Sequence, residues 1–159
     1  MIIFLDTSAI TKRYVEEVGS SILDEIYAKC WDKKHLISFP IWNIGEVLGV
    51  FDKLKNRKIL SENEFKHVIN RFISECFKLL EKGNLIIFPC TTPILVDSWK
   101  IVLNNHIYLA DALQITTAEA LNSHLFLSAD TSLIQIAKAR NLSAFSVETE
   151  LEQIIKKLS

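Results

Sequence analysis

Four acidic residues lie beside apolar segments that are expected to be in the protein core: Asp6, Glu46, Asp111 and Asp130. Asp6 and Asp130 each follow an apolar run directly, whereas Glu46 and Asp111 interrupt helix-like stretches with mostly apolar neighbours. A buried carboxylate is costly unless it is paired, hydrogen-bonded or bound to a metal. If the four side chains meet in space, they form a site for a hard cation, and that site would determine the function.

Each acid also has an ordinary structural explanation. Asp6 and Asp130 could cap the helices that follow them. Asp111 could be an acid in the first turn of a helix, where the helix dipole favours a negative charge. Glu46 could be a solvated residue at the rim of an apolar helix face. Because four acids would each need a separate explanation, a shared site is the stronger hypothesis.

Strands and helices alternate along the chain and must position these acids. Short apolar segments predict strands at residues 1–5, 36–39, 85–88, 125–129 and 144–147. Capping residues and apolar periodicity predict helices from Thr7 or Ser8 to Glu17, from Ser20 or Ser21 to Asp32, from Pro40 onward, and over residues 61–82, 92–105, 109–121, 132–140 and 148–158. This alternation predicts an α/β fold, a three-layer α/β/α sandwich with a central, mostly parallel sheet.

The predicted topology brings some of the acids together. In open parallel sheets, ligand sites lie at the carboxyl ends of the strands. Asp6 and Asp130 follow strands immediately, so both should project at that edge. Asp111 lies near the start of a helix whose N-terminus would face the same edge. Glu46 lies about two turns into the helix from Pro40, and spacing alone gives it the weakest case.

Composition limits the class of protein. Apolar residues make up 49% and charged residues 23%, which is typical of a folded chain, and 159 residues suit one domain, residues 1–159. The net charge of -1 requires any nucleic-acid contact to come from a local patch. Three cysteines with apolar flanks indicate buried thiols in a reducing compartment. Neither a signal peptide nor a membrane anchor is expected, which favours the cytoplasm.

The chain resembles the PIN domain family in four motifs that occur in the family's order. The opening Ile3-Phe4-Leu5-Asp6-Thr7-Ser8-Ala9 is similar to the family's first strand and acid. Glu46 matches the single helical Glu, Leu109-Ala110-Asp111-Ala112-Leu113 matches the acid-Ala-Leu helix, and Leu127-Ser128-Ala129-Asp130 matches the strand-end acid. The resemblance covers essentially the whole chain.

The resemblance implies a metal-dependent endoribonuclease, most often the toxin of a VapBC-type toxin–antitoxin pair. Its catalytic and metal-binding residues would be Asp6, Glu46, Asp111 and Asp130, with Mg²⁺ or Mn²⁺ as the ion. Ser132 stands where many relatives carry a further Asp, which reduces the expectation to at least one ion. Two alternatives remain: a nuclease without an antitoxin, acting in RNA processing or on DNA, and a catalytically silent metal-binding or scaffold domain.

Further residues are expected around the acids. The hydroxyls of Thr7, Ser8 and Ser128 could orient ligands or water, with capping as the alternative, and Asn43 lies one helical turn before Glu46. Phosphate contacts are expected from cations on two segments: Lys12, Arg13, Lys53, Lys55, Arg57 and Lys58. A run of basic residues usually forms a solvent-exposed face, but here it could bind RNA phosphates at the rim of the site.

Partners are also implied by the resemblance. The family's toxins commonly form homodimers and bind a small antitoxin whose tail occludes the acidic site. Large apolar residues on the helices from Pro40 and Ser61 exceed what one small core obviously needs, although core packing explains most of them: Trp42, Phe51, Phe65, Phe72 and Phe77.

Overall fold

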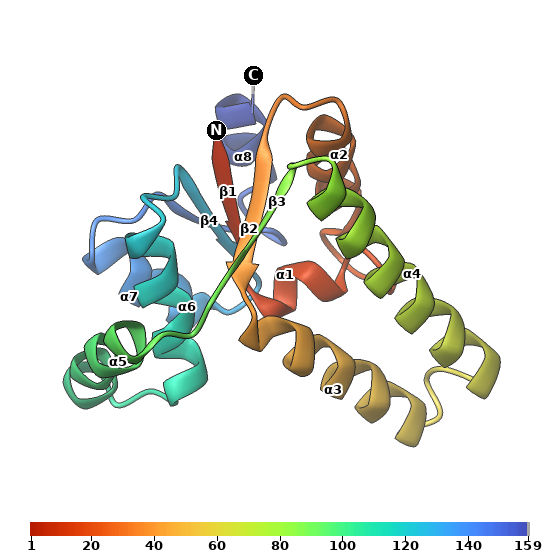
Figure 1. Cartoon of the computed structure of the whole chain (residues 1–159), viewed down its shortest axis with the longest axis horizontal. Coiled ribbons are helices and arrows are strands. Elements are labelled where there is room, and N and C mark those ends of the chain that lie inside the picture. The colour runs from red at the N-terminus through yellow and green to blue at the C-terminus, as the bar shows by residue number, and fades with distance from the viewer. Residues whose placement is uncertain (159) are drawn as a thin grey trace.

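The computed structural model, which describes residues 1–158, is a three-layer α/β/α sandwich around one parallel sheet (Figure 1). The strands are β1 (Ile2–Leu5), β2 (Leu36–Pro40), β3 (Leu85–Phe88), β4 (Leu125–Ser128) and β5 (Ala144–Ser146). They lie in the order β3-β2-β1-β4-β5, and every neighbouring pair is parallel. The predicted fold class is therefore confirmed, with a sheet that is parallel throughout.

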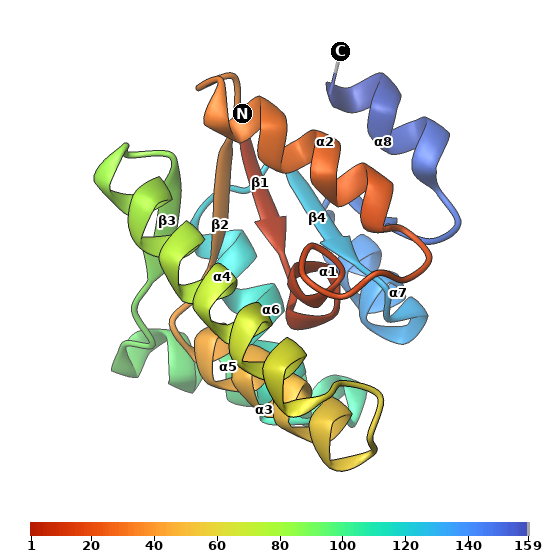
Figure 2. The same ribbon diagram turned by 90° about the vertical axis from the view of Figure 1, so that its right-hand side faces the viewer.

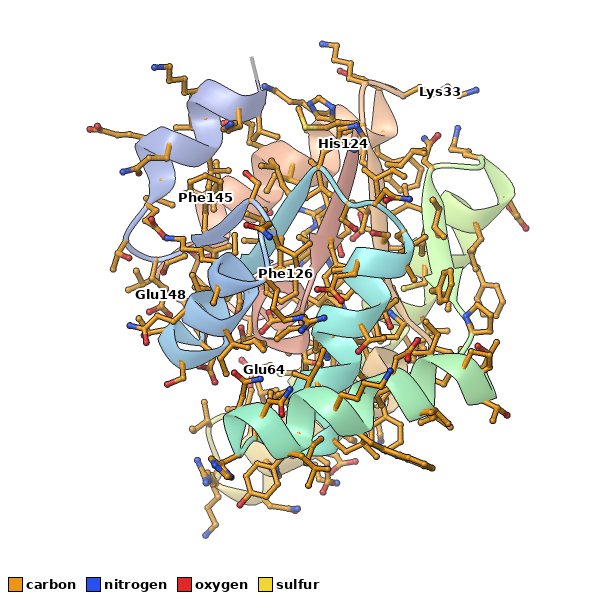
Figure 3. All side chains as sticks on the ribbon, turned by 90° about the vertical axis from the view of Figure 1, so that its left-hand side faces the viewer. Lys33, Glu64, His124, Phe126, Phe145 and Glu148 are labelled. Carbon is orange, nitrogen blue, oxygen red and sulfur yellow. The ribbon has the colours of Figure 1, made fainter. Side chains whose placement is uncertain are left out.

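Helices cover both faces of this sheet. They are α1 (Thr7–Thr11), α2 (Ser20–Trp31), α3 (Trp42–Asn56), α4 (Glu62–Glu81), α5 (Thr92–Asn105), α6 (Leu109–Ala120), α7 (Thr131–Ala139) and α8 (Leu151–Leu158). Figure 2 shows α2 and α4 in front of one face, with α8 beside α2, and Figure 3 shows α6 and α7 in front of the other, with α5 below α6. Within residues 1–158, none of these helices combines the length and the apolar character that crossing a membrane requires.

The sheet separates two hydrophobic cores because side chains alternate along each strand. Ile3 and Leu5 point into the core under α1, α2, α3, α4 and α8. Phe4 points to the opposite side, where its ring stacks on Phe126 with the centroids 5.2 Å apart. Figure 3 looks onto this opposite side of the sheet and shows Phe126 among the side chains there. Cys30 and Cys76 are buried as expected, whereas Cys90 is only half-buried.

The first helix is much shorter than predicted. It ends at Thr11 instead of Glu17, and the chain then turns, with the Arg13 amide donating to the Ile10 carbonyl at 3.1 Å. The turn places the Tyr14 ring in the same core as Ile3 and Leu5, where Tyr14 is 6% exposed. There it makes edge-on contacts with Tyr27, Phe51 and Phe72. Burial of this aromatic ring outweighs continuation of the helix.

Several other boundaries also differ from the prediction. Pro40 closes β2 instead of opening α3, because it pairs with Phe88 across the sheet. Helix α7 begins at Thr131, one residue early, and α8 begins at Leu151 because the preceding residues form a turn. In that turn the Thr149 amide donates to the Ser146 hydroxyl at 3.3 Å. Local hydrogen bonds to the Ser146 side chain thus favour a turn before α8.

Candidate active site

The structure places all four predicted acids in the lining of one pocket at the carboxyl edge of the sheet. The pocket has a volume of about 210 Å³, and its lining comprises Asp6, Thr7, Ser8, Glu46, Val50, Asp111, Gln114, Asp130 and Leu133. These residues come from α1, α3, α6 and α7 and from the ends of β1 and β4, which lie side by side in the sheet (Figure 1).

Asp6 forms the buried floor of the site, with 4% of its surface exposed. Its Oδ1 accepts hydrogen bonds from the Ala9 amide and the Ser8 hydroxyl, both at 2.7 Å, and its Oδ2 accepts one from the Ser128 hydroxyl at 2.6 Å. Asp6 is thus the N-cap of α1, a role that the sequence could equally have given to Thr7 or Ser8. The capping explanation is therefore confirmed for this residue, and the same side chain also lines the pocket.

Asp130 has the same double role at the end of β4. Its Oδ1 accepts from the Leu133 amide at 3.0 Å and caps α7, while its own amide donates to the Ser128 hydroxyl at 2.8 Å. In contrast to Asp6, it is exposed. The Ser128 hydroxyl therefore bonds the carboxylate of Asp6 and the backbone amide of Asp130.

Burial and mutual repulsion perturb the protonation of two of the acids. Burial raises the pKa of Asp6 to about 6, although the hydrogen bonds from Ser128, Ala9 and Ser8 oppose this rise. Burial also raises the pKa of Asp111, and the negative charges of Asp130 and Glu46 raise it further. The acids therefore interact electrostatically, and among residues 1–158 no Lys, Arg or His lines the pocket to compensate for their charge.

Glu46, for which spacing gave the weakest case, faces the same pocket. Its Oε2 accepts from the Thr7 hydroxyl at 2.6 Å and from Gln114 Nε2 at 3.3 Å. Thr7 thus links the helical acid to the segment after β1. Helix α3 begins at the end of β2 and runs past this edge, which brings Glu46 to the strand ends.

The polar residues that were expected around the acids fall into two groups in the structure. Thr7, Ser8 and Ser128 bond the acids directly. Asn43 is fully buried, does not line the pocket, and instead bonds Gln114. Sequence reasoning missed Gln114 altogether. A signal was present, because Gln114 is polar in an apolar helix and lies three residues after Asp111, on the same helix face.

Lys12 and Arg13 were expected near the phosphate, but neither lines the pocket. The Lys12 side chain is 4% exposed and forms ion pairs with Glu17 at 3.0 Å and Glu148 at 2.7 Å. Arg13 pairs with Glu75 at 3.0 Å, as part of a hydrogen-bonded network. The cause is the early end of α1, which sends both side chains towards carboxylates elsewhere. Both cations therefore stabilise the fold.

The basic residues at the end of α3 are placed differently. Glu46, Val50, Lys53 and Arg57 are spaced by four, three and four residues, so they follow one face of the helix. Lys53, Arg57 and Lys58 are exposed and form no ion pair within residues 1–158. Lys55 is half-buried, pairs with Asp52 at 3.7 Å, and lies over the Phe65 ring at 4.3 Å.

The donor chemistry of the pocket fits a hard cation, but its side chains are not assembled as one ligand set. Within residues 1–158 no group of three or more acidic, His or Cys side chains is arranged to hold an ion. Asp6 and Glu46 are instead hydrogen-bonded to neighbouring side chains: Asp6 to Ser8 and Ser128, and Glu46 to Thr7 and Gln114. Mg²⁺ commonly retains several waters and uses only one or two carboxylates directly, so the oxygen-rich lining suits a hydrated ion.

Comparison with protein families and curated proteins gives one match. A family model described as the PIN domain matches residues 3–139. Among curated proteins, none matches the sequence.

Several solved structures share the fold over most of their length. PAE2754 from Pyrobaculum aerophilum has a TM-score of 0.65 at 16% identity, with 98% of this chain and 99% of that chain covered. VapBC2 from Rickettsia felis, bound to a DNA fragment from its promoter, has a TM-score of 0.60 at 14% identity, with 92% and 98% covered. Mycobacterium tuberculosis VapC20, described as a sarcin–ricin loop cleaving toxin, has a TM-score of 0.62 at 12% identity, with 88% and 95% covered. At these identities the likeness establishes the fold.

Proposed function

Because this chain belongs to the PIN domain family, we propose that it is a cytoplasmic, metal-dependent endoribonuclease and the toxin of a toxin–antitoxin pair. The observation that carries the proposal is the convergence of Asp6, Glu46, Asp111 and Asp130 on one pocket. The description of VapC20, which shares the fold, as a sarcin–ricin loop cleaving toxin supports the choice of RNA and of the toxin role.

The side chains of the pocket have distinct tasks in this proposal. At least one Mg²⁺ or Mn²⁺, when bound, supplies a nucleophilic water and neutralises charge on the scissile phosphate. Asp6, fixed by hydrogen bonds to Ala9 and Ser128, offers a rigid carboxylate at the floor. Asp111 and Glu46 face it from two helices, and the exposed Asp130 lies at the mouth, where the phosphate arrives.

Metal dependence is tested by incubating the purified chain with a panel of single-stranded and structured RNAs, in Mn²⁺, in Mg²⁺ and with a chelator. The proposal expects cleavage only when a divalent ion is present. Cleavage that continues in chelator contradicts the proposed mechanism, and cleavage of DNA alone favours the alternative of a DNA-directed nuclease.

The exposed cations on α3 are the proposed path for the RNA backbone. Lys53 lies seven residues beyond Glu46, a separation of about 10 Å along the helix axis. This distance suits a phosphate one or two nucleotides away from the reacting one. Lys53 and Arg57 have no acidic partner within residues 1–158, so they can contact phosphates without first breaking an ion pair.

We therefore expect the double variant Lys53→Gln with Arg57→Gln to bind single-stranded RNA more weakly. Loss of two phosphate contacts should reduce the slope of log affinity against log salt by about 1.4. Fluorescence anisotropy with a labelled RNA, at several salt concentrations, measures this slope. The matched control is Lys156→Gln with Lys157→Gln, which removes two exposed charges from α8. Equal slopes in the two double variants contradict the proposed path.

A second copy of this chain and an antitoxin are the proposed protein partners. Phe51 and Phe72 belong to the core, but Trp42 and Phe77 remain 46% and 63% exposed. Phe77 also lies in an apolar groove beside the edge strand β3, lined by Ile41, Ile44, Ile73, Cys76, Phe77, Leu80 and Ile87. We assign this groove to the homodimer. The description of VapBC2 supports the antitoxin, which co-expression with an adjacent short reading frame tests.

Phe77→Lys is expected to convert the dimer into a monomer, because it places a charge in an interface that excludes water. Sedimentation velocity at micromolar concentrations measures the change. Val18→Lys is the control, since Val18 is 68% exposed and lies outside the groove. A parent chain that stays monomeric, or a Phe77→Lys variant that stays dimeric, contradicts the assignment of the groove.

A further inference from the structure

The Glu46 carboxylate is held by only one of its two oxygens. The Thr7 hydroxyl donates to Oε2 at 2.6 Å, and Gln114 Nε2 donates to the same oxygen at 3.3 Å. Within residues 1–158 no hydrogen bond reaches Oε1. The side chain is therefore anchored at Oε2, and Oε1 keeps its full capacity to accept.

Gln114 is itself fixed by a reciprocal amide pair. Its Nε2 donates to Asn43 Oδ1 at 2.7 Å, and Asn43 Nδ2 donates back to Gln114 Oε1 at 3.0 Å. Asn43 is fully buried and Gln114 is 3% exposed, so water does not compete for these bonds. The pair joins α3 to α6 at the carboxyl edge of the sheet, where the two helices approach each other (Figure 1).

The orientation of both amides follows from a backbone carbonyl. Asn43 Nδ2 also donates to the carbonyl of Leu5, the last residue of β1, at 3.3 Å. A carbonyl can only accept, so the NH₂ group of Asn43 must face β1, and its oxygen must face Gln114. The NH₂ group of Gln114 then faces both Asn43 and Glu46. Turning either amide would set acceptor against acceptor at buried positions, which costs about 1–3 kcal/mol.

We propose that the Asn43–Gln114 pair positions Glu46 for metal binding. The Leu5 carbonyl sets the direction of a chain of hydrogen bonds that runs through Asn43 and Gln114 to Oε2 of Glu46. Anchoring Oε2 leaves Oε1 to face the ion or its water. Because Gln114 and Asp111 share α6, the same contact also fixes the spacing between two of the acids. Asn43 and Gln114 are positioning residues, and the inference rests on the proposed role of Glu46.

A purely structural cross-link between α3 and α6 is the competing explanation, and a double-mutant cycle separates the two. Gln114→Met removes the donor at similar volume, and it is combined with Glu46→Gln. Mn²⁺ binding is measured by electron paramagnetic resonance, with thermal unfolding as the stability readout. We expect Gln114→Met to weaken Mn²⁺ binding about 10- to 100-fold in the parent chain. In the Glu46→Gln background its effect should be less than about twofold, because the group it acts through has changed.

The control and a second variant keep the inference testable. Thr116→Val removes another buried hydroxyl of α6. This hydroxyl accepts a 3.0 Å hydrogen bond from Ser98 and does not line the pocket, so the substitution should leave Mn²⁺ binding unchanged. Thr7→Val removes the other donor to Oε2 and should weaken binding in the same direction as Gln114→Met. If Gln114→Met does not fold, Asn43→Ser, which removes the amide partner of Gln114, replaces it in the same cycle.

Three results would overturn the inference, and two of them leave the proposed function intact. If the parent chain binds Mn²⁺ and Gln114→Met binds it equally well, or loses the same affinity with and without Glu46, only the positioning role fails. If the parent chain binds no Mn²⁺, the proposed function fails and the inference fails with it.

Discussion

Asp6→Asn is expected to lose RNA cleavage by at least about 100-fold, the size of effect seen when one group that stabilises a transition state is removed. The metal-free variant should nevertheless be at least as stable as the parent chain. Asparagine fits the volume of Asp6 but lacks the charge that the ion requires. Single-turnover cleavage and urea unfolding in chelator measure the two effects.

The expected gain in stability follows from the burial of Asp6. The rise of its pKa from 3.8 to about 6 corresponds to a cost of at most about 3 kcal/mol for the charged form at neutral pH. Asparagine removes this cost but weakens the bond from Ser128, so the net gain is smaller. Opposite changes in activity and stability are typical of a residue retained for function.

The raised pKa of Asp6 also makes the stability of the folded chain depend on pH. Between pH 3.8 and about 6 the Asp6 carboxyl binds more protons in the folded chain than in the unfolded chain. Its contribution to stability therefore falls as the pH rises through this window. In chelator, Asp6→Asn should lack this component of the pH profile. Asp97→Asn is the control, because Asp97 is exposed and makes only a 3.5 Å contact with Lys100. Unfolding profiles of the parent and Asp6→Asn that coincide from pH 4 to 7 contradict the account.

Glu75→Gln should have the largest effect on stability, a loss of about 3 kcal/mol, because it leaves the largely buried Arg13 with only the exposed Asp24 as a carboxylate partner among residues 1–158. Arg13 donates to both Glu75 oxygens, at 3.0 and 3.2 Å. The Tyr14 hydroxyl and the Trp31 indole add bonds of 3.0 and 3.1 Å. Glutamine keeps the shape of the side chain but replaces one acceptor with a donor.

The lowered pKa of Glu75 supports the expected loss of stability in Glu75→Gln. Burial raises the pKa of the Glu75 carboxyl, but the hydrogen bonds from Arg13, Trp31 and Tyr14 outweigh burial and hold it below its ordinary value. Its stabilising contribution is therefore complete above the ordinary carboxyl range and is lost as the pH falls through the lowered pKa. Chemical denaturation at pH 7 and pH 3.5 measures the difference.

Glu81→Gln is the matched control for Glu75→Gln, because Glu81 is exposed on the same helix. Loss of less than about 1 kcal/mol in Glu75→Gln, or a loss equal to that of Glu81→Gln, contradicts the assignment of Arg13 to the fold. RNA cleavage by the folded Glu75→Gln chain should remain close to that of the parent, since neither Arg13 nor Glu75 lines the acidic pocket.

The sequence predicted the fold and two of the acids on general physical grounds. Apolar strands that alternate with helices require a parallel sheet, and the end of each strand brings its acid to one edge. Asp6 and Asp130 could be placed in this way without reference to any family. Glu46 could not, because its position depends on where α3 crosses the edge, and the sequence misplaced the start of that helix.

The errors have a common cause, which is that side chains far apart in sequence decide local structure. Lys12 and Arg13 follow Asp6 closely, which favoured a role in phosphate binding. Instead, Glu148 and Glu75, which are remote in the chain, bind them. The pairing of Asn43 with Gln114 joins positions 71 residues apart. A periodic pattern reports which face of a helix is apolar, and it contains no information on which polar partner lies opposite.

The central claim is that the acids of the pocket carry out metal-dependent RNA cleavage. The most direct measurement is the single-turnover rate for one RNA substrate as a function of Mn²⁺ concentration, in the parent chain and in Asp111→Asn. The account predicts a rate that rises and saturates with Mn²⁺ in the parent, and a rate at least about 100-fold lower in Asp111→Asn at every concentration. A rate that does not depend on Mn²⁺, or one that is equal in the two chains, would contradict it.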